Sequence, residues 1–169
     1  TGGLRGKKRY LFEGGIRVPG IVRYPGLIAA GSVTDTTVTA LDVMPTVVEF
    51  VGASLPADRP IDGVSLLSLL GGESLSREKP MYWSIPTPDG MEYAIRHGNW
   101  KLILDSLGSP AALFNLADDF YEVHNKLDQM PEKVAEMKDL FERYRKDVDS
   151  DPVMRMREVV SASMHSDHR

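Results

Sequence analysis

Four basic side chains near the start of the chain are the residues best suited to hold an anion. They lie within LRGKKRYLFEGGIRVP, residues 4–19, and are Arg5, Lys7, Lys8 and Arg9. A charge run alone is more often a solvated loop, but Gly6 and the pair Gly14–Gly15 flank this one. Because glycines let backbone amides approach a bound oxyanion, the context favours an anion site. No nucleotide site is indicated, since neither G-x-x-x-x-G-K-[ST] nor G-x-G-x-x-G occurs.

Other residue types that commonly do chemistry show no comparable pattern. The chain contains no cysteine, which excludes a thiolate zinc site and a cysteine nucleophile on this chain. No serine lies in a G-x-S-x-G pattern, so a serine hydrolase triad is not indicated. We expect uncommitted imidazoles and assign no role to the four histidines, which are His97, His124, His165 and His168.

An acidic cluster follows the last strand-like run. Asp118, Asp119 and Glu122 could offer oxygen ligands to a hard cation, but a Ca²⁺ loop needs more ligands and a glycine at its sharp turn. We therefore expect a capped turn between a strand and a helix, and no metal site on this chain.

Size and charge restrict the possible classes. The 169 residues, 42% of them hydrophobic, suffice for one domain or for one domain and a piece of another. A net charge of −4 argues against a nucleic-acid partner, because such domains usually carry a basic excess. The apolar runs are far shorter than the roughly 20 residues that span a bilayer, so no membrane partner is expected. The chain starts at Thr1 without a signal-peptide pattern, and we expect a fragment.

The first half of the chain predicts one strand and two helices. The β-branched residues from Ile16 to Pro25 predict a strand that is kinked or at an edge near Pro19. A helical stripe follows, with Asp42 as its expected N-cap and Gly52 as its end; its apolar residues are Met44, Val47, Val48 and Val51. A turn or two of helix is expected between Val64 and Leu70.

The second half predicts an antiparallel sheet and a helix. Strand-like runs cover residues 81–86, 92–104 and 111–116, with a hairpin turn at His97-Gly98-Asn99. Pro131 begins a helix whose apolar side chains should cover one face of the sheet. These helix side chains are Val134, Met137, Leu140, Phe141 and Tyr144. Expected i, i+4 ion pairs on the solvent side are Asp139 with Arg143 and Glu142 with Lys146.

Several of these stretches together resemble a known family. LRGKKRYLFEGGIRVPGIVRYPG is similar to L-R-G-x-K, four residues, E-G-G-x-R-V-P and then P-G, which marks the second half of arylsulfatase-type sulfatases, members of the alkaline-phosphatase-like superfamily. In order, TALDVMPTVVEFVGA, IDGVSLLSLLGG, YAIRHGNWKLIL and LFNLADDFYEVHN resemble later family motifs. The resemblance spans residues 4 to about 145. One departure is DFYE, residues 119–122, where the family usually has Asp-Pro-x-Glu.

The resemblance implies a fold class and a domain plan. The fold class is α/β, or α+β for the isolated fragment: an edge of an alkaline-phosphatase-like domain followed by a small antiparallel sheet packed on a C-terminal helix. Residues 1–55 would complete the large α/β domain, and residues 56–80 would form a linker region. Residues 81–148 would form the small α+β domain, followed by a mobile tail at 149–169. The loop from Pro86 to Met91 is a candidate for contacting the non-sulfate part of a substrate.

The resemblance also implies hydrolysis of a sulfate ester. In the family, a formylglycine hydrate held by a divalent cation, usually Ca²⁺, attacks sulfur. The C/S-x-P-x-R motif that gives the formylglycine does not occur here, and the family's metal ligands belong to its N-terminal part, so the implied partners are the missing N-terminal part and the substrate. Lys8 matches the lysine that contacts the sulfate, which makes it the candidate catalytic and substrate-binding residue. Glu13 and Arg17 are expected to orient its loop by local pairing.

Two alternatives stay open at this point. The same superfamily includes hydrolases of phosphate and phosphonate esters, whose anions have a similar shape. A noncatalytic binding or structural module is the alternative from another class. The compartment is undetermined by the residues, although family habit favours the periplasm, secretion or the lysosome.

Overall fold

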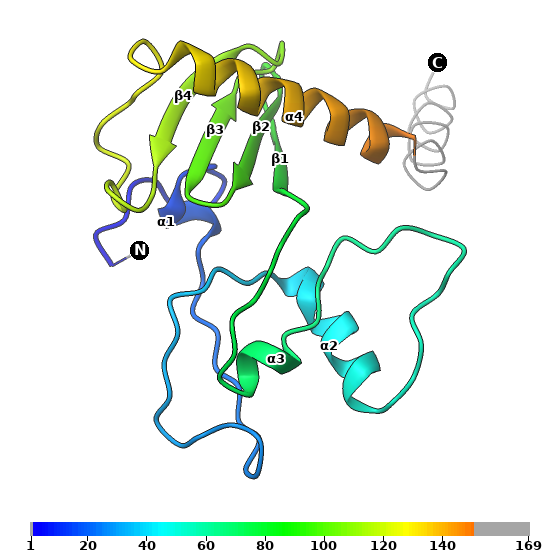
Figure 1. Cartoon of the computed structure of the whole chain (residues 1–169). Coiled ribbons are helices and arrows are strands. Elements are labelled where there is room, and N and C mark those ends of the chain that lie inside the picture. Colours follow the sequence, from blue (N-terminus) through cyan, green and yellow to red (C-terminus); the bar gives the residue numbers. More distant parts are fainter. Residues whose placement is uncertain (1, 151–169) are drawn as a thin grey trace, which may run out of the picture. The chain divides into compact units, whose positions relative to one another are not determined.

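The computed structural model describes residues 2–150, which form two compact units (Figure 1). Residues up to Arg17 join those from Pro80 onward in the sheet unit, and residues Val18–Lys79 form the helical unit. The expected boundaries at residues 55 and 80 stay a prediction for the intact protein. No helix within residues 2–150 combines the length and apolar character needed to cross a bilayer. Residues of the expected tail from 151 onward, with His165 and His168, lie outside the described residues.

The sheet unit is built on the predicted antiparallel meander. Its strands are β1 (Met81–Thr87), β2 (Gly90–His97), β3 (Trp100–Leu104) and β4 (Pro110–Asn115), in the spatial order β1-β2-β3-β4. The expected hairpin turn joins β2 to β3, where His97 pairs with Trp100. Gly98 has a φ of +57°, a conformation that glycine adopts without steric cost.

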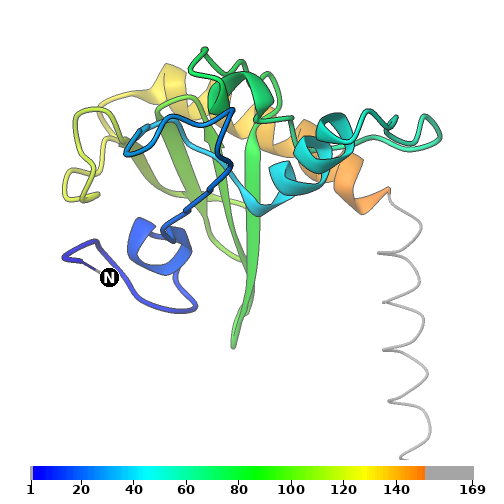
Figure 2. The same ribbon diagram turned by 90° about the horizontal axis from the view of Figure 1, so that it is seen from below.

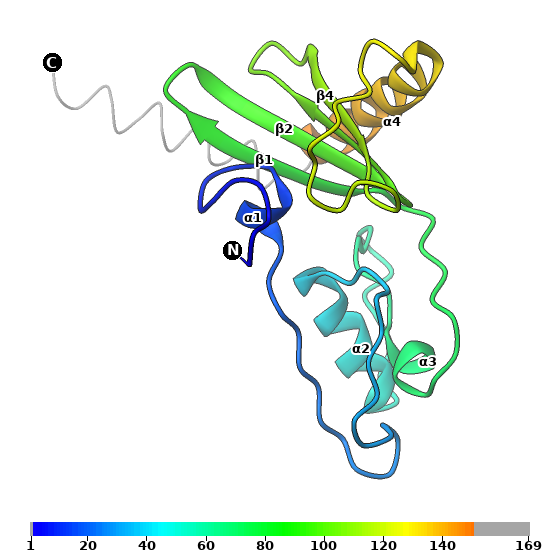
Figure 3. The same ribbon diagram turned by 90° about the vertical axis from the view of Figure 1, so that its left-hand side faces the viewer.

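One face of the sheet is covered by α4 (Pro131–Asp149), as predicted (Figures 1 and 3). Met137 and Phe141 are buried against side chains of the three strands β2, β3 and β4, and Val134, Leu140 and Tyr144 pack around them. Full burial of each such side chain contributes about 1.5–3 kcal/mol. The expected pair of Asp139 with Arg143 is present at 3.1 Å. Glu142 pairs with Lys138 instead of Lys146, because Lys138 also lies four residues away on the helix surface.

The other face of the sheet is covered by the N-terminal segment, which the sequence did not predict. This segment includes α1 (Glu13–Ile16), and Figures 2 and 3 show it on the side of the sheet away from α4. Leu11 packs with Ala94, Ile103 and Phe114 in a second core cluster. The sheet is therefore covered on both faces, and the segment that carries Lys8 belongs to the sheet unit.

The strand expected between Ile16 and Pro25 does not form. Residues 17–24 have no regular secondary structure, and Val18 and Ile21 are 80% and 94% exposed. A strand needs a neighbour for its backbone hydrogen bonds, and the described residues of the helical unit contain no other strand. High β-propensity alone did not suffice.

The helical unit consists of η1 (Ala40–Asp42), α2 (Val43–Phe50) and α3 (Leu67–Leu70). Gly52 ends α2 as predicted: its φ is +70°, and the N–H of Ala53 donates to the Val48 carbonyl. The predicted apolar stripe is present but largely exposed, with Met44, Val47 and Val51 all open to solvent.

Asp42 occupies the N-cap position of α2, as predicted, but its side chain makes no capping hydrogen bond to that helix. Its fully buried carboxylate accepts the N–H groups of Thr39 and Val64, and pairs with Arg77 at 2.5 Å. These contacts attach residues 64–77, part of the expected linker region, to the start of α2. The buried carboxylate thus completes the capping box of η1 and also holds residues distant in the sequence.

Candidate functional site

Lys8 lies at the tip of a tight turn. The N–H of Tyr10 donates to the Lys7 carbonyl at 2.9 Å, which closes a β-turn with Lys8 and Arg9 at its centre. Arg9 has a φ of +73°, as the third residue of a type II turn requires. Lys8 is exposed, and within residues 2–150 its ammonium group makes no hydrogen bond or ion pair. The ammonium is thus available to an anion.

The glycines of this segment serve a different purpose from the predicted one. The N–H of Gly14 donates to the Arg5 carbonyl at 2.7 Å, and that of Gly15 to the Phe12 carbonyl at 2.8 Å, so neither amide can serve an oxyanion. A Cβ on Gly14 would stand 2.5 Å from the Arg5 oxygen, and one on Gly15 would stand 2.0 Å from the Tyr10 oxygen. The glycines therefore let α1 pack directly on the backbone of the Lys8 loop.

Arg5 is exposed, but its guanidinium is engaged in contacts within the sheet unit. Its guanidinium donates to the Glu122 carbonyl at 2.6 Å and lies 4.1 Å from the centroid of the Phe12 ring. Such stacking of a cation on an aromatic ring is favourable. All four predicted anion-binding side chains are exposed, and Arg5 is the one whose contacts fix the loop.

Beneath the loop, three charged side chains meet in the interior. We call them the buried ion cluster: Glu13, Lys101 and Glu122, which are 3%, 0% and 0% exposed. The Lys101 ammonium lies 2.9 Å from Glu13 Oε1 and 2.8 Å from Glu122 Oε1. The backbone N–H of Glu13 donates to Glu122 Oε2 at 2.6 Å. The three contacts form a closed ring.

Each member of the cluster comes from a different element. Glu13 is the first residue of α1, Lys101 lies in β3, and Glu122 follows β4 in an irregular loop. Alternation along β3 turns Lys101 away from α4 and toward the N-terminal segment, opposite Phe114 and Arg96 of the neighbouring strands. The ring therefore fastens α1 to the centre of the sheet.

Two arginines complete the charge balance around Glu13. Arg17 Nη1 lies 3.2 Å from Glu13 Oε2, in accord with the predicted local pairing, and Arg96 Nη1 lies 3.9 Å from the same oxygen. Burial raises the pKa of Glu13, but Lys101, Arg17 and Arg96 together outweigh it and lower that pKa. For Arg96, burial disfavours the charged guanidinium and lowers its pKa, and the charge of Glu13 partly offsets this effect. Glu13 is accordingly a carboxylate at neutral pH.

The acidic residues after β4 divide into two roles. Asp119 accepts the N–H groups of Val123 and His124 at 2.9 and 2.7 Å, so it caps a turn as predicted. Burial opposes ionisation of Asp119, but these two hydrogen bonds outweigh it and lower its pKa. Glu122 instead belongs to the buried ion cluster, which the sequence interpretation missed. Among residues 2–150, no group of three or more histidine or acidic side chains could hold a metal ion.

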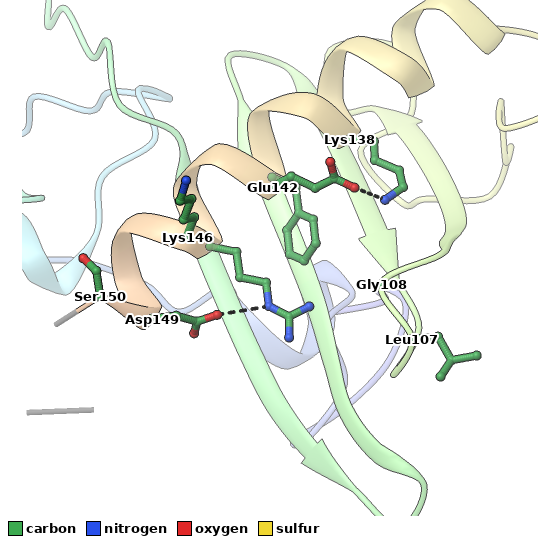
Figure 4. Close-up of a pocket in the computed structure, with 9 residues that line it drawn as sticks. Leu107, Gly108, Lys138, Glu142, Lys146, Asp149 and Ser150 are labelled. Atoms are coloured by element: carbon green, nitrogen blue, oxygen red, sulfur yellow. Dashed lines mark hydrogen bonds and ion pairs between the residues drawn. The ribbon is translucent and has the colours of Figure 1, made fainter. Parts of the chain in front are cut away.

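A hollow beside α4 lies on the other side of the sheet unit (Figure 4). Its charged walls are mostly paired: Lys138 with Glu142, and Arg145 with Asp149. Leu107 and Gly108 of the β3–β4 connection close one side. Because α4 and the N-terminal segment cover opposite faces of the sheet, this hollow is separate from the Lys8 turn. The loop from Pro86 to Met91 forms the β1–β2 hairpin, and its expected substrate contact stays a prediction.

Known proteins are similar to this chain in sequence and in structure. A family model described as "N-sulphoglucosamine sulphohydrolase, C-terminal" matches residues 6–148. Arylsulfatase A of Bos taurus is 33% identical over 159 residues, covering 80% of this chain and 31% of that protein. Steryl-sulfatase of Rattus norvegicus is 51% identical over 72 residues, covering 43% of this chain and 12% of that protein.

A solved structure described as "Crystal structure of Ps i-CgsB" superimposes with a TM-score of 0.74 and 27% identity. The match covers 83% of this chain and 31% of that one. The chain thus spans less than a third of the length of each of these relatives.

Proposed function

We propose, from the premise that this chain belongs to the C-terminal family of the sulfatases, that it supplies Lys8 and a wall of the substrate site for hydrolysis of a sulfate ester. The predicted fold class holds as well, since the chain combines an antiparallel sheet with helices and its structural neighbours have the alkaline-phosphatase-like fold. The observation that carries the proposal is the exposed ammonium of Lys8, which has no hydrogen bond or ion pair among residues 2–150 and lies on a turn that is fixed to the sheet.

The chemistry of sulfuryl transfer explains why a lysine suits this position. Negative charge on the nonbridging and leaving oxygens must be stabilised as the ester bond breaks. A compact ammonium held near those oxygens does so most strongly where water is excluded. Lys8 carries this charge on a four-carbon stem, so it can reach from the turn toward a bound sulfate. Lys7 and Arg9 add to the positive potential that attracts the anion.

The nucleophile and the cation are assigned to other parts of the intact protein. Family resemblance implies a formylglycine and Ca²⁺, and the described residues of this chain offer no group of ligands that fits the ion. The role of this chain is therefore to bind and orient the sulfate. By itself it is expected to be inactive toward a sulfate ester.

The helical unit is proposed to complete the large α/β domain. Its α2 leaves Val43, Met44 and Val47 about half exposed, an arrangement uncommon for a helix with a clear apolar stripe. Contact with further elements of the large domain would cover these side chains. On this plan residues 1–55 contribute to that domain, residues 56–80 link it, and residues 81–148 form the small domain, on whose sheet the residues up to Arg17 also pack.

Substitution of the two neighbouring lysines in the intact protein tests the proposed role. Lys8→Ala is expected to lower turnover of an aryl sulfate by about a hundredfold or more, the usual effect of removing one donor to a developing oxyanion. Lys7→Ala, the matched control one residue away, should have a much smaller effect. Equal effects would refute the assignment to Lys8. Turnover of the corresponding phosphate ester, measured in parallel, distinguishes a sulfatase from the phosphate ester alternative.

A further inference from the structure

We propose that Lys101 and Glu122 are positioning residues for Lys8. In this view the buried ion cluster fixes the Lys8 turn in the geometry that sulfuryl transfer requires, in addition to stabilising the fold. The inference rests on the proposed function of Lys8. It adds to that function two residues that contact neither the substrate nor the turn itself.

The buried ion cluster connects the sheet to the start of α1. Lys101 projects from β3, and both of its partners hold the start of α1: Glu13 through its side chain and Glu122 through the Glu13 N–H. Because the ring is closed, loss of one member leaves the other two with incomplete partners in the interior. The first turn of α1 therefore has one preferred position on the sheet.

Helix α1 is in turn packed closely on the Lys8 turn. Gly15 brings α1 against the carbonyls of Lys7 and Tyr10, the two residues that close the turn, with no room for a Cβ between them. Gly14 holds the Arg5 carbonyl by a hydrogen bond. A displacement of α1 would therefore move the backbone on both sides of Lys8.

Glu122 also attaches the beginning of the loop, through a hydrogen bond from Arg5. The Arg5 guanidinium donates to the Glu122 carbonyl, and the Glu122 carboxylate accepts the Glu13 N–H. One residue thus holds both the beginning of the loop and the beginning of α1. The segment between these two anchors contains Lys8.

Backbone strain marks the same two places. Within residues 2–150, the only non-glycine residues with positive φ are Arg9, beside Lys8, and Glu122, at +57°. Such conformations are unfavourable for residues with a Cβ and persist where surrounding contacts determine them. In this conformation the Glu122 carbonyl accepts from Arg5 while its carboxylate accepts the Glu13 N–H.

Stability alone does not account for a fully buried charged ring. Well-packed apolar side chains often stabilise an interior as well as an ion pair does, because burying charges carries a large desolvation cost. The opposite face of the same sheet shows this solution, with an apolar cluster under α4. A directional ring fixes orientation more narrowly than apolar contacts, and orientation is what Lys8 needs.

A double-mutant cycle in the intact protein tests this coupling. Glu122→Gln keeps the shape of the side chain and can still accept the Glu13 N–H, but it removes the charge that pairs with Lys101. We expect kcat for an aryl sulfate to fall about tenfold to a hundredfold, since small displacements of catalytic groups have effects of this size. In the Lys8→Ala background the same change should lower kcat less than about twofold, because coupled residues are non-additive.

Controls separate positioning from simple loss of stability. Met137→Ala lowers the melting temperature from the α4 face of the sheet, and its effect on kcat should be equal with and without Lys8. Arg5→Met is a milder second variant, to be used if Glu122→Gln does not fold. It removes the donor to the Glu122 carbonyl, and its effect on kcat should likewise disappear in the Lys8→Ala background.

Hydrogen exchange of the full chain provides a readout that does not depend on activity. Glu122→Gln should accelerate exchange of the Tyr10 and Gly14 amides more than that of the β2 and β3 amides. Additive losses of kcat, or uniform acceleration over the whole sheet unit, would overturn the inference and leave the role of Lys8 intact. Full activity of Lys8→Ala itself would instead refute the proposed function.

Discussion

The two faces of the sheet are held by different physical interactions. Under α4, apolar side chains such as Leu102, Leu113 and Phe141 pack together, and the Arg145 guanidinium lies over the Tyr93 ring at the edge of this cluster. Under the N-terminal segment, apolar contacts surround the fully buried Lys101 and its two carboxylates. Apolar packing is non-directional, whereas an ion ring has a defined geometry. The α4 face thus supplies stability, and the other face supplies stability together with a fixed position for the Lys8 turn.

The largest effect on stability is expected from a substitution in the buried ion cluster, on the polar face of the sheet. Lys101→Met leaves Glu13 and Glu122 close together in the interior without their shared cation. Removing one partner of a buried ion pair costs about 3–5 kcal/mol, so urea unfolding of the chain should show a loss of this size. In the intact protein, kcat per folded molecule should also fall. Loss of stability with unchanged kcat would limit the cluster to a structural role.

A substitution on the apolar face should cause a similar loss of stability without lowering kcat. Phe141→Ala removes a fully buried ring from the α4 interface and should cost about 3–5 kcal/mol in urea unfolding. Because this side chain has no contact with the N-terminal segment, kcat per folded molecule should match that of the wild type at a temperature where both are folded. A selective loss of kcat would show that the two faces are coupled.

Acid should affect the polar face first. The lowered pKa of Glu13 means that its ion pairs contribute stability above about pH 4.5, the ordinary value, and that this contribution is lost as the pH falls through the lower, folded-state value. Glu13→Gln lacks this titration. The difference in unfolding free energy between wild type and variant should therefore shrink as the pH falls below 4.5 and through the lowered folded-state pKa of Glu13. A constant difference over that interval would argue against an ionised Glu13 in the fold.

The smallest expected effect concerns the turn itself. Arg9 adopts a φ of +73°, which glycine tolerates without steric cost. Arg9→Gly should relieve strain but make the unfolded chain more flexible, so the net change in stability should be within about 1 kcal/mol. Thermal unfolding of the sheet unit measures it. A larger destabilisation would mean that the Arg9 side chain holds the turn.

Local signals in the sequence predicted a large part of the fold. Pro131 and the apolar positions of α4 predicted that helix, and His97-Gly98-Asn99 predicted the hairpin, because both depend on residues close together in the chain. The strand expected at 16–25 failed because a strand depends on a neighbour, which its own residues do not specify. Asp42 was correctly placed at the start of α2, but the hydrogen bond that its carboxylate accepts from Val64, 22 residues away, could not be foreseen.

The buried ion cluster could not be found from local patterns. Glu13 is 88 residues from Lys101 and 109 residues from Glu122, so nothing in either neighbourhood points to the other. One signal was present, since Lys101 stands within the apolar strand run WKLIL. Lysine is almost never fully buried unless it is paired. That rule predicts an acidic partner for Lys101, but not which one.

The most direct test of the account is the position of Lys8 relative to a bound sulfate. A crystal structure of the intact protein with an unreactive sulfate ester analogue would show it. We expect Lys8 Nζ to lie about 2.7–2.9 Å from a sulfate oxygen, the usual distance for a charge-assisted hydrogen bond. A sulfate held by Lys7, or bound with Lys8 directed into solvent, would contradict it.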